Sequence, residues 1–462
     1  MARTQLARIL PALAVVACSA EPVDDRARRP DVVLLSLDTF RRDALGVLAP
    51  GRRSATPRLD GLAADAVLFT TAYAPVPFTL SSHMSLLTGV YPDAHGVVDE
   101  GLSLGSGLPT LAELLRRGGY RSEAVVTSRW LDASFGFDHG FDGYVRLPEG
   151  LSSARRVTDA ALEILDRRAS GEDRAPLFLF LHYYEAHSDF RDGDNRWPYY
   201  APPEHRPQAG EEASWCTREG VCATGFLDSL NRRRRRLPAD RLEALRALYD
   251  GGVRTLDLEI GRLLDELHRR GSYDGSLLVV TADHGEEFQE HGQLLHSQPY
   301  DETVVVPLLV KRPAATGGGR RLDVPVALVD VAPTLLDQLG LERPDHLQGR
   351  SLLPLLAAGE APAESLLSQD KGRRTRYALR LDRWKLVLDL DTDVAELYEL
   401  QTDPGEQRNL AARHPAEVER LRSHLASILT RSRDLSRTLG AVPATPLPPE
   451  HRDDLRALGY LD

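Results

Sequence analysis

Short apolar segments constrain the fold of this chain more than any other feature of its sequence. Apolar segments of this length are typical of strands that are buried on both faces of a parallel sheet. They occupy residues 31–37, 123–126, 177–181 and 276–280. Longer segments with helical periodicity lie between them, among them residues 153–168 and 239–270. The alternation predicts an α/β fold with a central, mostly parallel sheet flanked by helices.

The sequence changes in character near residue 365. The segments after this point are short and are typical of strands in an antiparallel sheet, at residues 376–380, 384–388 and 396–400. Residues 415–431 have the pattern of a helix packed on that sheet. We therefore predict an α/β domain over residues 31–365, a small C-terminal antiparallel-sheet (α+β) subdomain over 366–435 and a tail over 436–462.

The charge balance bears on the kind of partner that the chain binds. Its 462 residues include 57 Lys and Arg against 68 Asp and Glu, which gives a formal net charge of −11. The charge is spread along the chain, whereas nucleic-acid binding generally requires a basic face. We therefore expect no nucleic-acid partner.

The first 17 residues have the pattern of a signal peptide. Arg3 and Arg8 accompany a short apolar segment at residues 9–17, which is too short to span a bilayer as a stable helix. Residues 15–18 (Val-Val-Ala-Cys) resemble the lipobox of bacterial lipoproteins, so that Cys18 would carry a lipid anchor to the membrane and begin a linker over residues 18–30. The alternative is a simple secretory signal with an incidental cysteine. Both interpretations predict export to the periplasm or cell envelope.

The chain has two further cysteines, Cys216 and Cys222, which are close together in the sequence. Gly220 lies between them and allows a tight loop. In an oxidising compartment such a pair predicts a small disulfide loop, whereas two thiols alone make a poor zinc site. The predicted disulfide and the predicted export support each other.

Polar side chains that can bind a metal or a substrate follow three of the predicted strands. They are Asp38 after the first strand, His182, Glu185 and His187 after the strand at 177–181, and Asp283 and His284 after the strand at 276–280. Because ligands of open α/β sheets bind at the carboxyl ends of the strands, we expect these side chains to converge. A single Asp at such a position is often only a helix cap, but three converging sets are difficult to explain in that way.

Asp38, Asp283 and His284 form the best candidate set of metal ligands. Carboxylate oxygens together with an imidazole nitrogen suit a divalent cation such as calcium, manganese or zinc. Gly285 follows the Asp-His pair and leaves room for both side chains to turn toward one ion. The sequence therefore predicts one divalent metal ion as a cofactor.

The nucleophile candidate is Thr79, which precedes a predicted short helix at residues 82–87. Its hydroxyl would lie near the partly positive end of that helix, where an anion also binds favourably. Coordination to a metal would lower the pKa of the hydroxyl and make it a nucleophile. The alternative is that Thr79 merely caps the helix, since Ser and Thr caps are common.

The sequence around Thr79 resembles the signature of the sulfatase family, in the alkaline-phosphatase superfamily. That signature is Cys/Ser-x-Pro-Ser-Arg followed by Thr-Gly, and here it is Thr-Leu-Ser-Ser-His at residues 79–83 with Thr-Gly at 88–89. Other segments resemble family blocks in the same order, at residues 35–46, 281–288, 289–293, 299–302, 329–336, 347–352 and 396–410. The resemblance implies the alkaline-phosphatase-like fold, with a mixed, mostly parallel sheet, and a metal-dependent hydrolase of ester bonds.

The residue at the signature position bears on which ester is cleaved. Sulfatases convert their Cys or Ser to formylglycine, whose hydrate uses one hydroxyl to attack sulfur and the other to expel sulfate. Thr79 has a single hydroxyl, so a threonyl sulfate would need slow attack by water at sulfur. A threonyl phosphate can be hydrolysed in line on a metal, and threonine is the nucleophile in related phosphodiesterases and phosphoethanolamine transferases. The resemblance indicates a sulfatase, whereas Thr79 indicates a phosphate or phosphonate ester.

Further positions depart from the sulfatase pattern. The signature arginine is His83, the second metal carboxylate is Thr39, and the amide ligand is His284, as in phosphonate hydrolases of the superfamily. A substrate-binding lysine is absent near residue 126, where Arg129 is its replacement candidate. The resemblance implies catalytic roles for Thr79 and His83.

Two histidines complete the predicted site. His296 occupies the position of a sulfatase lysine that contacts the leaving oxygen, and an imidazole there suits a general acid near neutral pH. His187 matches a substrate-contacting histidine, and Glu185 is a further substrate-binding candidate. In the alternative, His296, His187 and Glu185 hold a second ion, which would give a two-metal site.

The resemblance and the departures leave several functions open. The first is hydrolysis of phosphoric or phosphonic esters, and the second is hydrolysis of sulfuric esters by an arylsulfatase in the strict sense. The third is a phosphoethanolamine-type group transferase, and the fourth is an inactive binding protein of the envelope. For the first three functions, which are enzymatic, the expected partner is a small-molecule, glycan or lipid ester.

Overall fold

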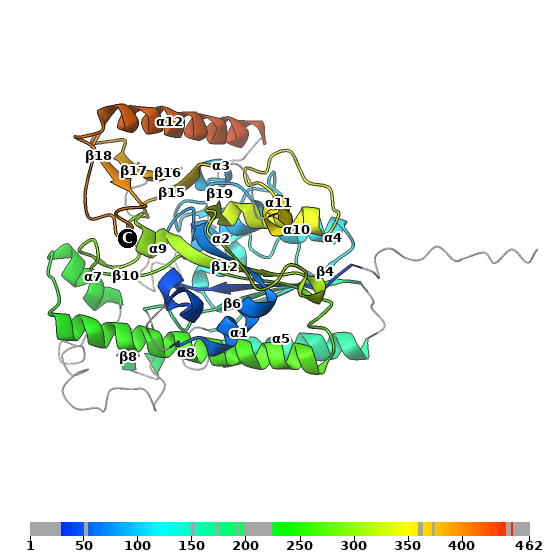
Figure 1. The fold of residues 1–462 in the computed structure, drawn as a ribbon. Helices are drawn as coiled ribbons and strands as arrows, with labels where there is room; N and C mark the ends of the chain where they lie inside the picture. The colour runs from blue at the N-terminus through cyan, green and yellow to red at the C-terminus, as the bar shows by residue number, and fades with distance from the viewer. Residues whose placement is uncertain are drawn as a thin grey trace, which may run out of the picture.

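The predicted apolar segments form the interior strands of one central sheet (Figure 1). Every residue of β1 (Val32–Leu37), β6 (Leu177–Tyr183) and β9 (Leu277–Ala282) is buried. β1 lies between the other two and pairs in parallel with both. The structure is a computed structural model that describes residues 29–49, 54–148, 153–171, 175–188, 190–192, 195–197, 224–358, 364–371, 375–439 and 445–446.

Within those residues the central sheet has nine strands, in the order β13-β2-β12-β9-β1-β6-β4-β5 with β14 beside β2. β12 (Val305–Lys311) runs antiparallel to β2 and β9, and the other described pairs are parallel. The remaining strands are β2 (Val67–Tyr73), β4 (Arg121–Val126), β5 (Gly143–Arg146), β13 (Arg320–Leu322) and β14 (Val326–Ala327). The mixed, mostly parallel sheet that the sequence predicted is confirmed.

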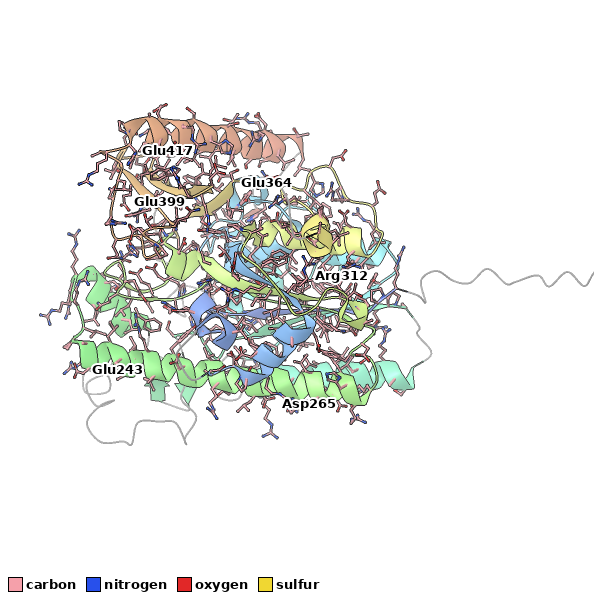
Figure 2. The ribbon with its side chains drawn as sticks, viewed as in Figure 1. Glu243, Asp265, Arg312, Glu364, Glu399 and Glu417 are labelled. Carbon is pink, nitrogen blue, oxygen red and sulfur yellow. The ribbon has the colours of Figure 1, made fainter. Side chains whose placement is uncertain are left out.

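Helices cover both faces of the sheet (Figure 1). One face carries α1 (Pro57–Asp65), α5 (Ser153–Ser170) and α8 (Ala239–Arg269). The other carries α2 (Thr79–Thr88), α4 (Leu111–Arg117) and α10 (Val331–Gln338). Figure 2 shows the charged side chains of Glu243 and Asp265 on the outer side of α8. In the described part of the chain, none of the helices combines the length and the apolar character that crossing a bilayer requires.

Shorter elements complete the domain. The helices are α3 (Pro92–His95), α7 (Thr224–Arg232), α9 (Asp301–Val304) and α11 (Leu353–Ala358). The 3-10 helices are η2 (Arg42–Ala44), η3 (Gly46–Leu48), η4 (Arg129–Leu131), η5 (Ala133–Phe135), η6 (Pro313–Ala315) and η7 (Leu328–Asp330). The short strands form three pairs: β3 (Leu102–Ser103) with β19 (Thr445–Pro446), β7 (Phe190–Asp192) with β8 (Asn195–Trp197), and β10 (Glu287–Phe288) with β11 (Leu294–Leu295).

The C-terminal residues form a separate antiparallel sheet covered by a helix. Its strands are β15 (Leu366–Gln369), β16 (Arg376–Leu381), β17 (Trp384–Asp389) and β18 (Ala395–Glu399). α12 (Pro415–Thr438) packs on this sheet, with Leu421 and Leu425 in one apolar cluster with Leu379 and Leu386. The predicted sheet and helix are confirmed, and β15 is an additional strand.

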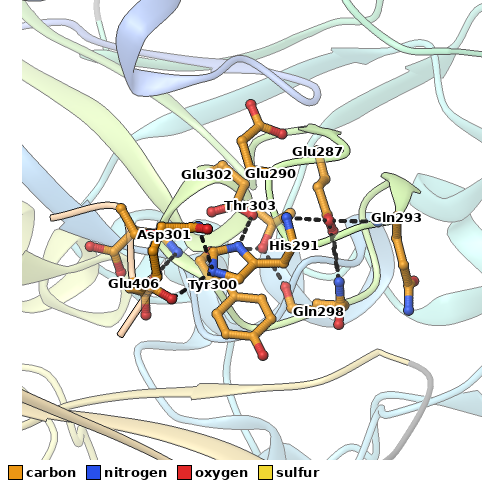
Figure 3. A network of polar contacts seen from close by, with 12 residues as sticks. Glu287, Glu290, His291, Gln293, Gln298, Tyr300, Asp301, Glu302, Thr303 and Glu406 are labelled. Atoms are coloured by element: carbon orange, nitrogen blue, oxygen red, sulfur yellow. Dashed lines mark hydrogen bonds and ion pairs between the residues drawn. The ribbon is translucent and has the colours of Figure 1, made fainter. Parts of the chain in front are cut away.

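A charged and polar network joins the C-terminal subdomain to the main domain (Figure 3). Lys385 Nζ is fully buried and lies 2.6 Å from Asp301 Oδ1 and 2.8 Å from Glu406 Oε1. Glu406 Oε2 also accepts a hydrogen bond from the backbone N–H of Asp301 at 2.7 Å. Nearby, His291 stacks on Tyr300 with ring centroids 3.6 Å apart. Because Asp301 begins the helix that leads directly into β12, this network fixes the subdomain against the central sheet.

Replacing Lys385 by methionine should lower the free energy of unfolding by about 3–5 kcal/mol, because it leaves Asp301 and Glu406 without their shared cation. Urea unfolding of the purified variant measures the change. The control is Arg437→Met, which removes an exposed pair with Asp434 and should cost less than about 1 kcal/mol. Equal stability of the Lys385→Met variant and the unaltered protein would contradict the proposed importance of the network.

Candidate active site

Three candidate ligands meet at the carboxyl ends of two adjacent strands. Asp38 follows β1 and Asp283 follows β9, and both side chains are fully buried. Together with His284 they each offer a ligand atom within 4.8 Å of the others. Among the described residues this is the one group of three or more His, Cys, Asp or Glu side chains arranged in this way. The structure thus brings together the ligand set that the sequence predicted.

The surroundings of Asp283 fit a bound divalent cation. Its Oδ1 accepts hydrogen bonds from the backbone N–H groups of Thr39 at 3.2 Å and His284 at 2.9 Å. Its Oδ2 is buried and makes no hydrogen bond. Burial, and then the charge of Asp38, raise the pKa of Asp283 well above its ordinary value. A cation beside Oδ2 would offset both effects, so the donor set fits a metal ion.

His284 presents its Nε2 atom to the same point. Its Nδ1 donates a hydrogen bond to the backbone carbonyl of Gly285 at 3.0 Å, which leaves Nε2 as the unprotonated nitrogen of a neutral ring. Burial, and then His296, lower the pKa of His284, which also favours the neutral ring. A Cβ atom at Gly285 would lie 2.3 Å from the carbonyl oxygen of Glu302, so close backbone packing requires this glycine.

Thr39 follows Asp38 in a tight turn beside the ligand set. Its hydroxyl donates to the backbone carbonyl of Asp38 at 2.8 Å, and its backbone N–H binds Asp283. Its φ of 55° is in the left-handed region, which is unfavourable for a β-branched residue. Tyr249 stabilises this turn, since its hydroxyl donates to the carbonyl of Thr39 at 3.0 Å. In this structure the backbone of Thr39 orients Asp283, and its role as a metal ligand stays a prediction.

The nucleophile candidate lies beside the ligand set. Thr79 Oγ1 is 3.4 Å from His284 Nε2, and Thr79 is almost fully buried. The prediction that Thr79 precedes its helix is wrong, because α2 begins at Thr79 itself and Phe78 is its N-cap. Ser82 donates to the carbonyl of Asp283 at 2.6 Å, which fixes the helix against the ligand loop. The start of α2 therefore lies at the site, where its partial positive charge favours an anion.

His83 lies about one helical turn after Thr79 in α2, and both of its ring nitrogens form hydrogen bonds. Its Nδ1 donates to the carbonyl of Thr79 at 2.8 Å, so its Nε2 accepts from the Ser36 hydroxyl at 2.8 Å. Burial, and then His182, lower its pKa well below the ordinary value. In this structure His83 positions Thr79, and its catalytic role stays a prediction.

His296 and His187 lie on the other side of His284. The ring centroid of His296 is 4.4 Å from that of His284 and 5.3 Å from that of His187. Nδ1 of His296 is 3.2 Å from Glu286 Oε2, so this carboxylate orients the ring. Glu286 lies directly after the Asp-His-Gly segment, but its sequence position alone did not predict this role. The two predicted histidines are thus adjacent to the ligand set.

The two predicted substrate-binding residues, Glu185 and Arg129, lie in different surroundings. Glu185 lies at the start of α5, where its Oε1 accepts hydrogen bonds from Ser153 Oγ at 2.7 Å and from the backbone N–H of Ala154. This carboxylate oxygen caps α5, whereas Glu185 Oε2 is buried without a hydrogen bond, so the substrate contact stays a prediction. Among the described residues, Glu185, His187 and His296 do not form a group of possible metal ligands. Arg129 begins η4, which packs against α2. Burial, and then His296, lower the pKa of His187, and Arg129 makes a smaller contribution.

The remaining residues to compare with the sequence predictions are His182, Lys371 and the cysteines. His182 Nε2 lies 3.2 Å from Asp38 Oδ2 and orients that ligand, a role that its strand-end position suggested only in general terms. Lys371, from the C-terminal subdomain, also lies near the site and carried no sequence signal. Cys18, Cys216 and Cys222 lie outside the described residues, so the lipid anchor and the disulfide stay predictions.

The fold and this cluster define an ester-bond hydrolase with the alkaline-phosphatase-like fold. The chain belongs to the sulfatase family, whose profile matches residues 30–341. The profile of the N-sulphoglucosamine sulphohydrolase C-terminal region matches residues 289–434. Members of the sulfatase family generally use a divalent metal ion, in agreement with the donor set described above.

Curated relatives and solved structures extend this finding. The chain is 24% identical to N-acetylglucosamine-6-O-sulfatase of Bacteroides thetaiotaomicron, over 91% of this chain and 89% of the relative. It is also 24% identical to arylsulfatase K of Homo sapiens, over 90% of this chain and 86% of the relative. The fold is similar to that of a phosphonate monoester hydrolase of Agrobacterium radiobacter, with a TM-score of 0.68, 23% identity and coverage of 87% and 96% of the two chains.

Replacing Asp283 by asparagine should have opposite effects on stability with and without metal. Asparagine keeps an oxygen for the hydrogen bonds from Thr39 and His284 but removes a buried charge beside Asp38, so the metal-free variant should melt at a higher temperature than the metal-free parent. With metal at about 1,000-fold above its Kd, the parent should gain about 4 kcal/mol and the variant much less. Thermal unfolding with chelator and with added metal measures both effects.

The matched control is Asp257→Asn. Asp257 is also a buried carboxylate that accepts two backbone N–H groups, from Arg58 and Leu59, but it lies away from the ligand set. This control should respond to metal as the parent does. An Asp283→Asn protein that gains as much stability from metal as the parent would contradict the ligand role.

Proposed function

We propose that this chain hydrolyses esters of phosphoric or phosphonic acid, with Thr79 as the nucleophile. The observation that carries the proposal is the Thr79 hydroxyl, 3.4 Å from His284 Nε2 at the start of a buried helix. A threonine has no second hydroxyl with which to expel a sulfate group, so water must release any covalent intermediate. Release by water in line is favourable at phosphorus.

The remaining residues have roles that follow from their positions. A divalent ion held by Asp38, Asp283 and His284 would supply charge stabilisation and lower the pKa of the Thr79 hydroxyl. Calcium, manganese and zinc all suit such ligands. His83 holds the carbonyl of Thr79, and Thr39 holds Asp283, so nucleophile and ligand keep a fixed relative position.

The proposed reaction proceeds in two steps. Thr79 Oγ1 loses its proton and forms a bond to phosphorus while the bond from phosphorus to the leaving oxygen breaks. The leaving oxygen takes a proton from the protonated form of His296, and the proton lost by Thr79 restores that form. Glu286 keeps the His296 ring oriented for this transfer. His187 and Arg129 bind the charged acid group as it reacts. Water then attacks the phosphorus of the threonyl ester, which releases phosphate or phosphonate and restores the Thr79 hydroxyl.

Hydrolysis of sulfuric esters is the second candidate function. The observation in its favour is the family match over residues 30–341, together with similarity to two proteins named as sulfatases. Both candidates use the same ligand set and differ in how the covalent intermediate is released. An assay that compares the two classes of ester therefore separates them.

The test compares Thr79→Ala with the unaltered protein on aryl phosphate, aryl phosphodiester, aryl phosphonate and aryl sulfate. The variant should lose on the order of 10⁴-fold or more in kcat, as expected when a nucleophile is removed, while it keeps its bound metal. Release of the aryl alcohol measures the rate, and elemental analysis measures the metal. The unaltered protein should cleave a phosphorus ester faster than the sulfate.

The control is Thr88→Ala, which removes a hydroxyl from the far end of the same helix, where it donates to the carbonyl of Met84 at 2.6 Å. Its turnover should stay within a few-fold of the parent. Full activity of Thr79→Ala would refute the nucleophile assignment. Cleavage of aryl sulfate alone would favour the second candidate function.

A further inference from the structure

A cation from the C-terminal subdomain lies at the edge of the proposed active site. Lys371 follows β15, in the segment that leads toward β16. Its backbone N–H donates to the carbonyl of Ser297, the residue after His296, at 3.0 Å. Its Nζ lies 4.4 Å from the centre of the ring of Phe78, the residue before Thr79. Lys371 therefore lies between the immediate neighbours of the proposed nucleophile and the proposed acid.

Backbone contacts hold this lysine in place. Ser368 Oγ donates to the carbonyl of Ala74 at 2.6 Å, and the backbone N–H of Gln369 donates to the carbonyl of Pro75 at 2.7 Å. These bonds fix the end of β15 against the loop that leads into α2. Because the backbone is held at Lys371 and at the residues before it, ordering its side chain around a ligand costs mainly side-chain entropy.

The charge of Lys371 acts on the site. It contributes to the lowered pKa values of His187, His284 and His296. Burial lowers the pKa of Lys371 itself, and nearby carboxylates, Asp38 among them, act in the opposite direction. The ammonium of Lys371 carries three N–H donors, and its Nζ lies against the ring of Phe78, beside Thr79.

Such a cation would add to the positive charge that the metal ion and Arg129 are proposed to supply. The positions at which the family pattern has an arginine and a lysine are His83 and His296 in this chain. Both nitrogens of His83 are used by Thr79 and Ser36, so His83 cannot also contact a substrate. An anionic substrate therefore requires cationic groups from other elements of the fold.

We propose that Lys371 is a substrate-binding residue whose ammonium binds the negatively charged oxygens of the acid group of the ester. The inference rests on the proposed function, because it places that group between Thr79 and His296. The ligand is an oxyanion, as in a phosphate monoester, a phosphodiester, a phosphonate or the released phosphate. Hydrogen bonds from an ammonium to such oxygens are charge-assisted and stronger than neutral ones. The C-terminal subdomain thus contributes directly to substrate recognition.

Binding of inorganic phosphate tests this proposal without turnover. Calorimetry is performed on the full-length, metal-loaded Thr79→Ala protein, alone and combined with Lys371→Met or with Lys371→Arg. The methionine variant should bind phosphate about 10- to 100-fold more weakly, as expected when a charged hydrogen-bond donor is removed. The arginine variant should stay within a few-fold, because it keeps the positive charge. Melting temperatures of all three proteins should be similar.

The control is Arg431→Met in the same Thr79→Ala protein, which removes an exposed cation of α12 that bonds only Ser427 among the described residues. Its phosphate affinity should be unchanged. Unchanged affinity in Lys371→Met, or no phosphate binding to the metal-loaded Thr79→Ala protein, would overturn the inference. Weaker phosphate binding in Lys371→Met, in a protein that hydrolyses no phosphorus ester, would support Lys371 and refute the proposed function.

Discussion

The close approach of two buried carboxylates, Asp38 and Asp283, is the constraint on which the rest of the structure depends. In a medium of low dielectric, two such charges repel strongly, and burial alone already disfavours each of them. The ends of β1 and β9 nevertheless hold them within ligand distance of each other and of His284. A divalent cation turns this repulsion into attraction. We therefore expect an ion to stabilise the site, while the surrounding residues keep the donors oriented.

The fold supplies that orientation through a few specific contacts. The parallel pairing of β1 with β6 and β9 brings three strand ends to one edge of the sheet. The left-handed turn at Thr39 directs a backbone N–H at Asp283, and Ser82 ties the start of α2 to the same loop. The buried Lys385 fixes the C-terminal sheet to the main domain, and the segment after β15 brings Lys371 to the edge of the site. Nucleophile, ligands and the proposed anion contact thus come from distant parts of the chain.

The sequence predicted the features that depend on local residue patterns. It did not predict the features that depend on how distant segments pack together. The uninterrupted apolar character of β1, β6 and β9 predicted both the sheet and the position of Asp38 and Asp283. β12 escaped prediction because Pro307 interrupts it at a bulge, and proline usually argues against an interior strand. The direction in which a side chain points also could not be predicted from the sequence. Glu185 follows a strand as a ligand would, yet it turns to cap α5. Lys371 belongs to another subdomain, and no local pattern connects it to Thr79.

The most direct test is a crystal structure of the protein grown with manganese, with anomalous diffraction recorded to locate the ion. The account predicts one strong anomalous peak within about 2.0–2.6 Å of oxygens of Asp38 and Asp283 and of Nε2 of His284, with the Thr79 hydroxyl beside it. A peak at another place, or bound manganese that leaves these four residues without contact to it, would contradict the account.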